Sequence, residues 1–144
     1  MERLLLAAFL ALSLAGCASV NMGDPKQDAA AKTFKAPQGH AGVYIYRNES
    51  MGAAVKMDVA IDGQPLGQTV AKTFLYKEVT PGKHTITSKA ENTDTLEIDA
   101  QPAVLYFIWQ EVKMGVLYAR NKLQLVDDAT GKKGVLETSL AETK

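Results

Sequence analysis

Residues that carry most catalytic and metal chemistry are scarce in this chain. Its 144 residues include one cysteine, Cys17, and two histidines, His40 and His84. One cysteine cannot form a disulfide within the chain, so the fold must be stabilised by packing even in an oxidising compartment. A zinc site needs three or four converging ligands, and the two histidines form no ligand-spaced cluster. We therefore predict no metal and no bound cofactor, and we expect His84, which follows a turn, to be a half-exposed sheet residue.

Motifs for nucleophilic catalysis and phosphate binding are also missing. The chain contains no G-x-S-x-G segment and no glycine-rich loop that could hold a phosphate. Two carboxylate pairs occur, Glu97 with Asp99 and Asp127 with Asp128. The first pair alternates along the wet face of a predicted strand, and the second is typical of a turn or helix cap rather than of acid–base catalysis. The sequence therefore predicts a protein that is not an enzyme.

Neither sign of charge is in excess. Sixteen lysines and arginines balance sixteen acidic residues, so the formal net charge is zero. Proteins that bind nucleic acid, or that adhere to anionic lipid by charge alone, usually carry a basic excess. We therefore expect no nucleic-acid partner.

Long hydrophobic runs are absent too. The longest run, Leu4 to Ala15, has twelve residues that are apolar apart from Ser13. A membrane-spanning helix needs about 20 such residues, whereas a run of this length fits the hydrophobic region of an export signal. A buried core helix is the alternative, but a core helix rarely starts at residue four. We predict a signal peptide over residues 1–16.

The four residues Leu14-Ala15-Gly16-Cys17 resemble the bacterial lipobox. That resemblance implies cleavage between Gly16 and Cys17, a diacylglycerol group on the Cys17 thiol and a fatty acyl chain on the new amino terminus. Two or three acyl chains anchor a protein stably to a membrane. Ala18 follows Cys17, where an inner-membrane retention signal would have Asp. We therefore expect an envelope protein anchored in the outer membrane and facing the periplasm if the source has one; a free buried cysteine is the alternative.

The chain after the signal divides into two parts. Residues 17–38 are polar, small or proline-containing, with little apolar periodicity, which predicts a flexible tether of about 25 Å root-mean-square length. Residues 39–144 are long enough for a single domain with its own core. From His40 onward the apolar period becomes two, which is typical of half-buried strands.

Turn residues separate the predicted strands at short intervals. Asp62-Gly63 offers the positive-φ turn of a tight hairpin, and Pro81-Gly82 is a second strong turn. The expected strands cover residues 43–46, 55–61, 66–70, 74–79, 84–89, 96–99, 104–109 and 122–126. Seven or eight short strands predict an all-β antiparallel sandwich, with a small barrel as the alternative.

A short helix is expected after the last strand. Asp127-Asp128 can cap it, with Val135 on its apolar side. Gly131 and Gly134 would each weaken such a helix by about 1 kcal/mol.

The turns and strand residues together resemble a known family. The motifs are Tyr44-Ile45-Tyr46-Arg47, Ile61-Asp62-Gly63, Leu66-Gly67, Pro81-Gly82-Lys83-His84, Tyr106-Phe107 and Leu125-Val126-Asp127. In this order they are similar to an uncharacterised bacterial lipoprotein family, domain of unknown function 2846, over about residues 32–128. The resemblance implies a prealbumin-like or PEGA-like sandwich and carries no catalytic residues. The chain departs from the expected glycine turn at Gln101-Pro102-Ala103.

Aromatic residues give the best candidate for a binding surface. Tyr44, Tyr46, Tyr106 and Trp109 lie on strands that are apolar on both faces, and Arg47 follows two of them. Tyrosine and tryptophan are enriched in interface hot spots. The alternatives are a two-sided core beneath the C-terminal segment and, for Arg47, a strand-end salt bridge.

These observations predict a lipid-anchored envelope protein that acts as a non-catalytic binding or structural module. It would dock a protein or an envelope polymer through a sheet edge or the aromatic face. A carrier of a small apolar ligand between two sheets is the alternative and requires an internal cavity. An envelope hydrolase has less support.

Overall fold

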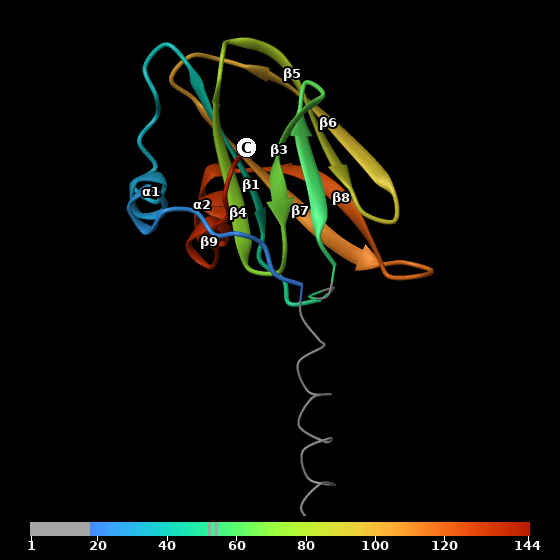
Figure 1. Cartoon of the computed structure of the whole chain (residues 1–144). Helices are drawn as coiled ribbons and strands as arrows, with labels where there is room; N and C mark the ends of the chain where they lie inside the picture. Colours follow the sequence, from blue (N-terminus) through green and yellow to red (C-terminus); the bar gives the residue numbers. More distant parts are fainter. Residues whose placement is uncertain (1–17, 52, 54) are drawn as a thin grey trace, which may run out of the picture.

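The computed structural model describes residues 18–51, 53 and 55–144, and within them it is a β-sandwich (Figure 1). One sheet has five strands in the order β8-β7-β1-β4-β9, and the other has four in the order β3-β2-β5-β6. The strands are β1 (Ala41–Arg47), β2 (Met57–Ile61), β3 (Gln64–Thr69), β4 (Thr73–Val79), β5 (Gly82–Lys89), β6 (Thr93–Ala100), β7 (Leu105–Met114), β8 (Ala119–Val126) and β9 (Ser139–Leu140). The helices are α1 (Pro25–Ala31) and α2 (Asp128–Leu136). The predicted sandwich and the eight long strands are confirmed.

The two sheets differ in strand direction. All pairs in the four-stranded sheet are antiparallel. In the five-stranded sheet β1 pairs antiparallel with β4 but parallel with β7, and β4 pairs parallel with β9. The parallel pairing places the carboxyl ends of β1 and β7 at the same end of the sandwich.

The predicted turns form where the sequence places them. Asp62 and Gly63 both have positive φ, 52° and 79°, between β2 and β3. This backbone matches the twist of the strands that it connects. Gly82, the first residue of β5, has a φ of 118°. At the departure from the family pattern, Ala103 has a φ of 59° and its N–H donates to the His40 carbonyl at 2.7 Å.

The space between the sheets is filled by aliphatic side chains. Val43 and Ile45 of β1 meet Ile86 of β5 and Val59 of β2, and all four are buried. Burying each such side chain contributes about 1.5–3 kcal/mol. These side chains occupy the place where a carrier would hold its ligand.

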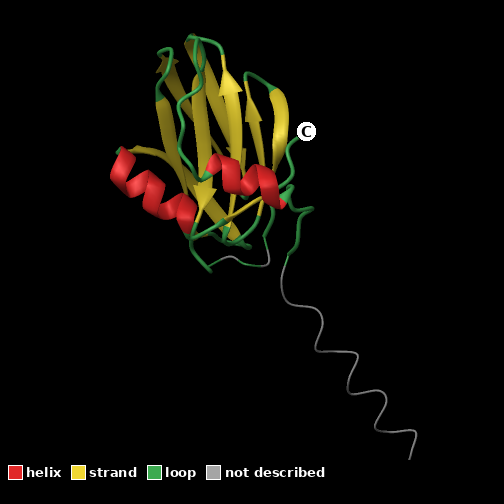
Figure 2. Ribbon diagram, turned by 90° about the vertical axis from the view of Figure 1, so that its left-hand side faces the viewer, coloured by secondary structure: helices red, strands yellow, loops and turns green. Residues whose placement is uncertain are grey.

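The outer face of the five-stranded sheet forms a second, aromatic core. Tyr44, Phe74 and Phe107 are buried there, and Phe107 stacks on Tyr44 at 4.9 Å between ring centroids. Figure 2 shows both helices on this side of the strands. Val135 of α2 and Phe34, which follows α1, pack onto the rings.

Helix α2 forms where it was predicted, and its glycines explain its position. Asp127 caps it, accepting from the Thr130 N–H at 3.3 Å and hydroxyl at 2.6 Å. A Cβ at Gly131 would lie 2.2 Å from Phe107 Cβ, and a Cβ at Gly134 would lie 2.2 Å from Tyr46 Cε2. The glycines therefore allow the helix to rest directly on the sheet.

The prediction of a flexible tether does not hold for residues 21–34. Asp24 caps α1, and Pro25 occupies its first turn. Met22 forms a bridge with Ala141, and the Gly23 N–H donates to the Leu140 carbonyl at 2.8 Å. The segment is held by residues at the far end of the chain, which local sequence patterns do not reveal.

None of the helices in the described part of the chain is long and apolar enough to cross a membrane. The predicted signal peptide, Gly16 and Cys17 lie outside the described residues.

Candidate functional site

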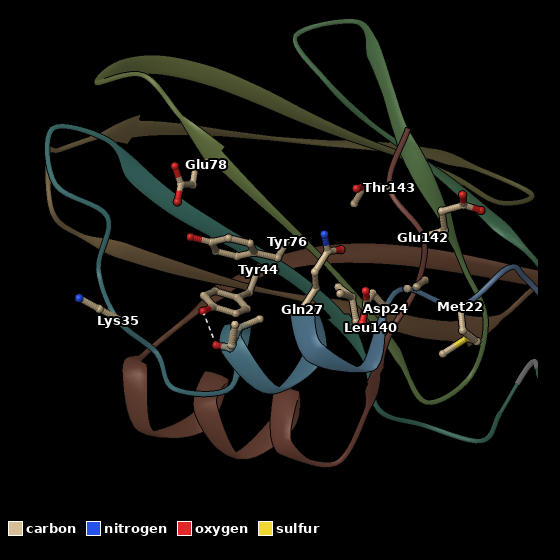
Figure 3. A pocket seen from close by; sticks show the side chains of 14 residues that line it. Met22, Asp24, Gln27, Lys35, Tyr44, Tyr76, Glu78, Leu140, Glu142 and Thr143 are labelled. Atoms are coloured by element: carbon tan, nitrogen blue, oxygen red, sulfur yellow. Dashed lines mark hydrogen bonds between the residues drawn. The ribbon is translucent and has the colours of Figure 1, made fainter.

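A cleft lies between α1, β4 and the C-terminal segment (Figure 3). Its volume is about 690 Å³, and it is open to solvent. Segments from both ends of the chain line it, from Met22 to Lys35 on one side and from Leu140 to Thr143 on the other. A cleft of this size falls in the range that binds small molecules or a short peptide segment.

Two tyrosines form its floor. The rings of Tyr44 and Tyr76 lie side by side, 4.6 Å apart between centroids and inclined by 47°. The Tyr44 hydroxyl donates to the Ala31 carbonyl at 2.7 Å, which ties the floor to α1. Burial raises the pKa of both phenols, reinforced for Tyr44 by Tyr76 and for Tyr76 by Glu78. Both therefore stay neutral at physiological pH and offer an aromatic surface.

Charged side chains form the rim. Asp24, Glu78 and Glu142 contribute carboxylates, and Lys35 contributes a cation. Gln27 adds an amide from α1 (Figure 3). A rim with three carboxylates above aromatic rings favours ligands that carry basic or polar groups.

Helix α1 is held in place as the wall of the cleft. Asp28 forms an ion pair with Lys32 at 2.8 Å and also accepts from the Leu140 N–H at 2.8 Å. The Asp24 carboxylate accepts from the Lys26 N–H at 2.7 Å. A seven-residue helix is marginal by itself, so these contacts and the bond from Tyr44 fix its position.

The five predicted surface residues do not form one exposed surface. Tyr44, Tyr46 and Arg47 are buried, and Trp109 is partly buried against the aromatic core. Tyr106 lies on the other side of β7, where its hydroxyl accepts from the Gln101 N–H at 2.9 Å and donates to the Asp99 carbonyl. Tyr44 and Tyr46 therefore belong to a two-sided core, which was the alternative interpretation. Tyr44 contributes to the cleft only as part of its floor.

Arg47, predicted as part of a binding surface, lies in a buried polar cluster. Its guanidinium donates to the carbonyls of Val55 at 2.7 Å and Thr69 at 3.3 Å. The neighbouring Glu49 carboxylate is also buried. Desolvation raises the pKa of Glu49, although the Trp109 indole N–H, the Val112 backbone and Arg47 all favour its charged form. Arg47 and Glu49 therefore place two opposite charges inside the protein, where they attract each other electrostatically.

Polar side chains also connect the two sheets through the core. The Thr69 hydroxyl donates to Gln110 Oε1 at 2.6 Å, and Gln110 Nε2 donates to Ser88 Oγ at 2.7 Å. All three are buried. These hydrogen bonds were not predicted from the sequence. The position of Gln110 within an otherwise apolar strand could have indicated a buried polar contact.

The remaining candidates have structural roles. His84 Nδ1 lies 2.5 Å from Asp62 Oδ2, and this bond raises the pKa of His84 and lowers that of Asp62. Glu97 and Asp99 lie on the exposed face of β6. Within the described part of the chain, no group of three or more histidine, cysteine or acidic residues could hold a metal ion.

Comparisons place the sandwich among known sequences. The model of the family DUF2846, described as a protein of unknown function, matches residues 37–121. An uncharacterized protein of Haemophilus influenzae is 36% identical over 135 residues, which is 92% of this chain and 80% of the relative. No solved structure matches. The family match spans β1 to β7 and the start of β8, and both helices lie outside it.

Proposed function

The chain belongs to DUF2846, a family of proteins of unknown function, and from this premise we propose that it is a lipid-anchored protein of the bacterial envelope that binds a target without catalysis. The target is a basic or polar segment of a protein or an envelope polymer. The observation that carries the binding role is the open cleft with its floor of Tyr44 and Tyr76 and its acidic rim. Aromatic floors with placed polar groups are typical of recognition sites.

The proposed anchor depends on Leu14-Ala15-Gly16-Cys17. Cys17→Ser is expected to abolish labelling by a radioactive or clickable fatty acid and to leave an unprocessed precursor. Labelling that survives this substitution would refute the lipid anchor and leave the cleft proposal intact.

The packing favours a cleft binder over a carrier or a hydrolase. The aliphatic core fills the space between the sheets, whereas a carrier needs that space for its ligand. The polar chain of Thr69, Gln110 and Ser88 is buried and satisfied internally, so it does not face a substrate.

Site-specific photo-cross-linking tests the cleft in living cells. A photoreactive amino acid at Gln27, on the cleft wall, is compared with one at Lys83, at the start of β5 and outside the cleft. We expect a discrete adduct from position 27 that is absent from position 83 and is lost when Glu78 and Glu142 are both changed to Gln. Equal adducts from the two positions, or none from position 27, would contradict binding in the cleft.

A further inference from the structure

The tip of the β7–β8 hairpin presents apolar side chains to solvent. Met114 is 84% exposed, Val116 89%, Leu117 83% and Tyr118 53%. Single exposed apolar residues are ordinary, but a contiguous group marks a contact surface. We call residues 114–118 the apolar tip.

Hydrogen bonds to one carboxylate hold the backbone of the apolar tip. The Glu91 carboxylate, from the β5–β6 turn, accepts from the backbone N–H groups of Val116 at 3.0 Å and of Leu117 and Tyr118 at 3.2 Å. Desolvation alone would raise the pKa of Glu91. The three backbone donors together lower it by more, so the net shift is downward. A Cβ at Gly115 would lie 2.1 Å from Glu91 Oε2, so a larger residue there would displace the carboxylate from these donors. The contacts with Glu91 therefore stabilise the loop with its apolar side chains exposed.

The apolar tip lies at the end of the sandwich where the described chain begins. Because β1 and β7 are parallel, the loop after β1 and the apolar tip lie at the same end. The Ala18 N–H donates to the Ala53 carbonyl in that loop at 3.0 Å. Figure 1 shows the orange hairpin and the blue start of the chain at the same lower side. Residue 18 directly follows the predicted lipid attachment at Cys17.

The hairpin also projects beyond its neighbour. Tyr46 pairs with Trp109, so β7 continues for four residues, Glu111 to Met114, after the end of β1. At about 3.3 Å per residue, this is about 13 Å of additional strand. The apolar tip can therefore reach a surface that touches this end of the sandwich.

The chemistry of the apolar tip fits a lipid surface. Tyr118 is a residue type enriched at membrane–water interfaces. Behind the tip, Lys113 and Arg120 are paired across the hairpin and exposed, where their cationic groups can reach lipid headgroups. Glu91 and Glu111 are also close, so apolar insertion and not net charge supplies the attraction. A stable dimer needs about 20–30 residues a side, which argues against a second copy as the occupant.

We propose that residues Met114–Tyr118 insert into the bilayer surface beside the lipid anchor. This inference rests on the anchor under the proposed function. Insertion of an apolar loop to a depth of about 5–10 Å is typical of interfacial segments. Together with the anchor it fixes the orientation of the sandwich, with the Asp62-Gly63 and Pro81-Gly82 turns facing away from the membrane.

A single fluorescent label tests the insertion. In the full lipidated protein the Cys17 thiol is occupied, so Leu117→Cys provides the one free thiol for an environment-sensitive dye. Lys83→Cys is the matched control, because Lys83 is 76% exposed at the opposite end of the sandwich. Both proteins are reconstituted into phosphatidylethanolamine–phosphatidylglycerol vesicles with and without brominated lipid, and acylation is checked by mass spectrometry.

The outcomes separate the two proposals. We expect the dye at position 117 to emit at shorter wavelength and to be quenched by brominated lipid, while the dye at position 83 does neither. Vesicle-bound, acylated protein with identical behaviour at both positions would overturn the insertion and leave the anchor intact. A dye at 117 that is shielded but unquenched would show that protein covers the apolar tip and would also overturn it. If mass spectrometry shows that the mature protein with an intact Cys17 carries no acyl chains, the anchor itself is overturned.

Discussion

Replacing Gly131 by Ala tests the close contact between α2 and the sheet. In an exposed helix this change stabilises the protein by about 1 kcal/mol, because Gly is the poorer helix former. At Gly131 the new Cβ would lie 2.2 Å from both Cβ and Cγ of Phe107. Phe107 Cβ can move only with the backbone of β7, which is the second strand of the five-stranded sheet. The change therefore forces α2 away from the aromatic core.

The two effects have opposite signs, and the structure decides which one is larger. Overpacking in a well-packed core costs about 1–3 kcal/mol, and the fixed position of Phe107 Cβ places this contact at the upper end. After the gain in helix propensity, we expect Gly131→Ala to lower the free energy of unfolding by about 2 kcal/mol. For a domain of this size, that corresponds to a fall in Tm of roughly 8 °C.

Urea unfolding followed by Trp109 fluorescence, with a parallel thermal scan, measures the change. Lys133→Ala is the matched control, because Lys133 is exposed on the same helix and should change stability by less than about 0.5 kcal/mol. An increase in Tm for Gly131→Ala would mean that helix propensity dominates, and would refute the close packing of α2 on Phe107.

Two further predictions concern buried or paired charges. Because the pKa of His84 is higher in the folded than in the unfolded protein, its bond to Asp62 stabilises the fold fully at pH values below the unfolded pKa, near 6.5. This stabilisation is lost as the pH rises through the folded pKa. Asp62→Asn keeps an acceptor for the Thr85 N–H, so urea titrations from pH 6 to 9 should show a smaller loss than the parent, by less than about 1 kcal/mol; an NMR titration with the His84 pKa at or below 6.5 would contradict this. Arg47→Met removes the cation that attracts the buried Glu49 carboxylate, together with the hydrogen bonds to Val55 and Thr69, and should cost about 3 kcal/mol, part of which Glu49→Gln recovers. Equal losses in the single and double variants would argue against charge pairing.

The strands could be predicted because their determinants are local. Val55 to Ile61 alternates with period two, and Asp62-Gly63 supplies the positive-φ pair at the end of that strand. Asp127 likewise marks the start of α2. Hydrophobic period and turn chemistry therefore suffice for the sandwich.

The candidate site could not be predicted, because its parts meet only in three dimensions. Tyr44 belongs to a strand that is apolar on both faces, and such a strand does not reveal whether helices or a ligand cover its second face. Residues 21–34 show little apolar periodicity, and the partners that hold them, such as Leu140, are distant in sequence. The Glu91 contacts with the apolar tip similarly join two turns that are distant in sequence.

The contacts of Met22 and Gly23 with Ala141 and Leu140 determine when the cleft can form during synthesis and folding. Met22 and Gly23 are synthesised long before their partners Ala141 and Leu140. Contacts between such distant segments require closure of a long loop and form late in folding. The wall of the cleft is therefore completed only after Leu140 and Ala141 have been synthesised, and a nascent or truncated chain that stops before them lacks the site even where its sheets have formed.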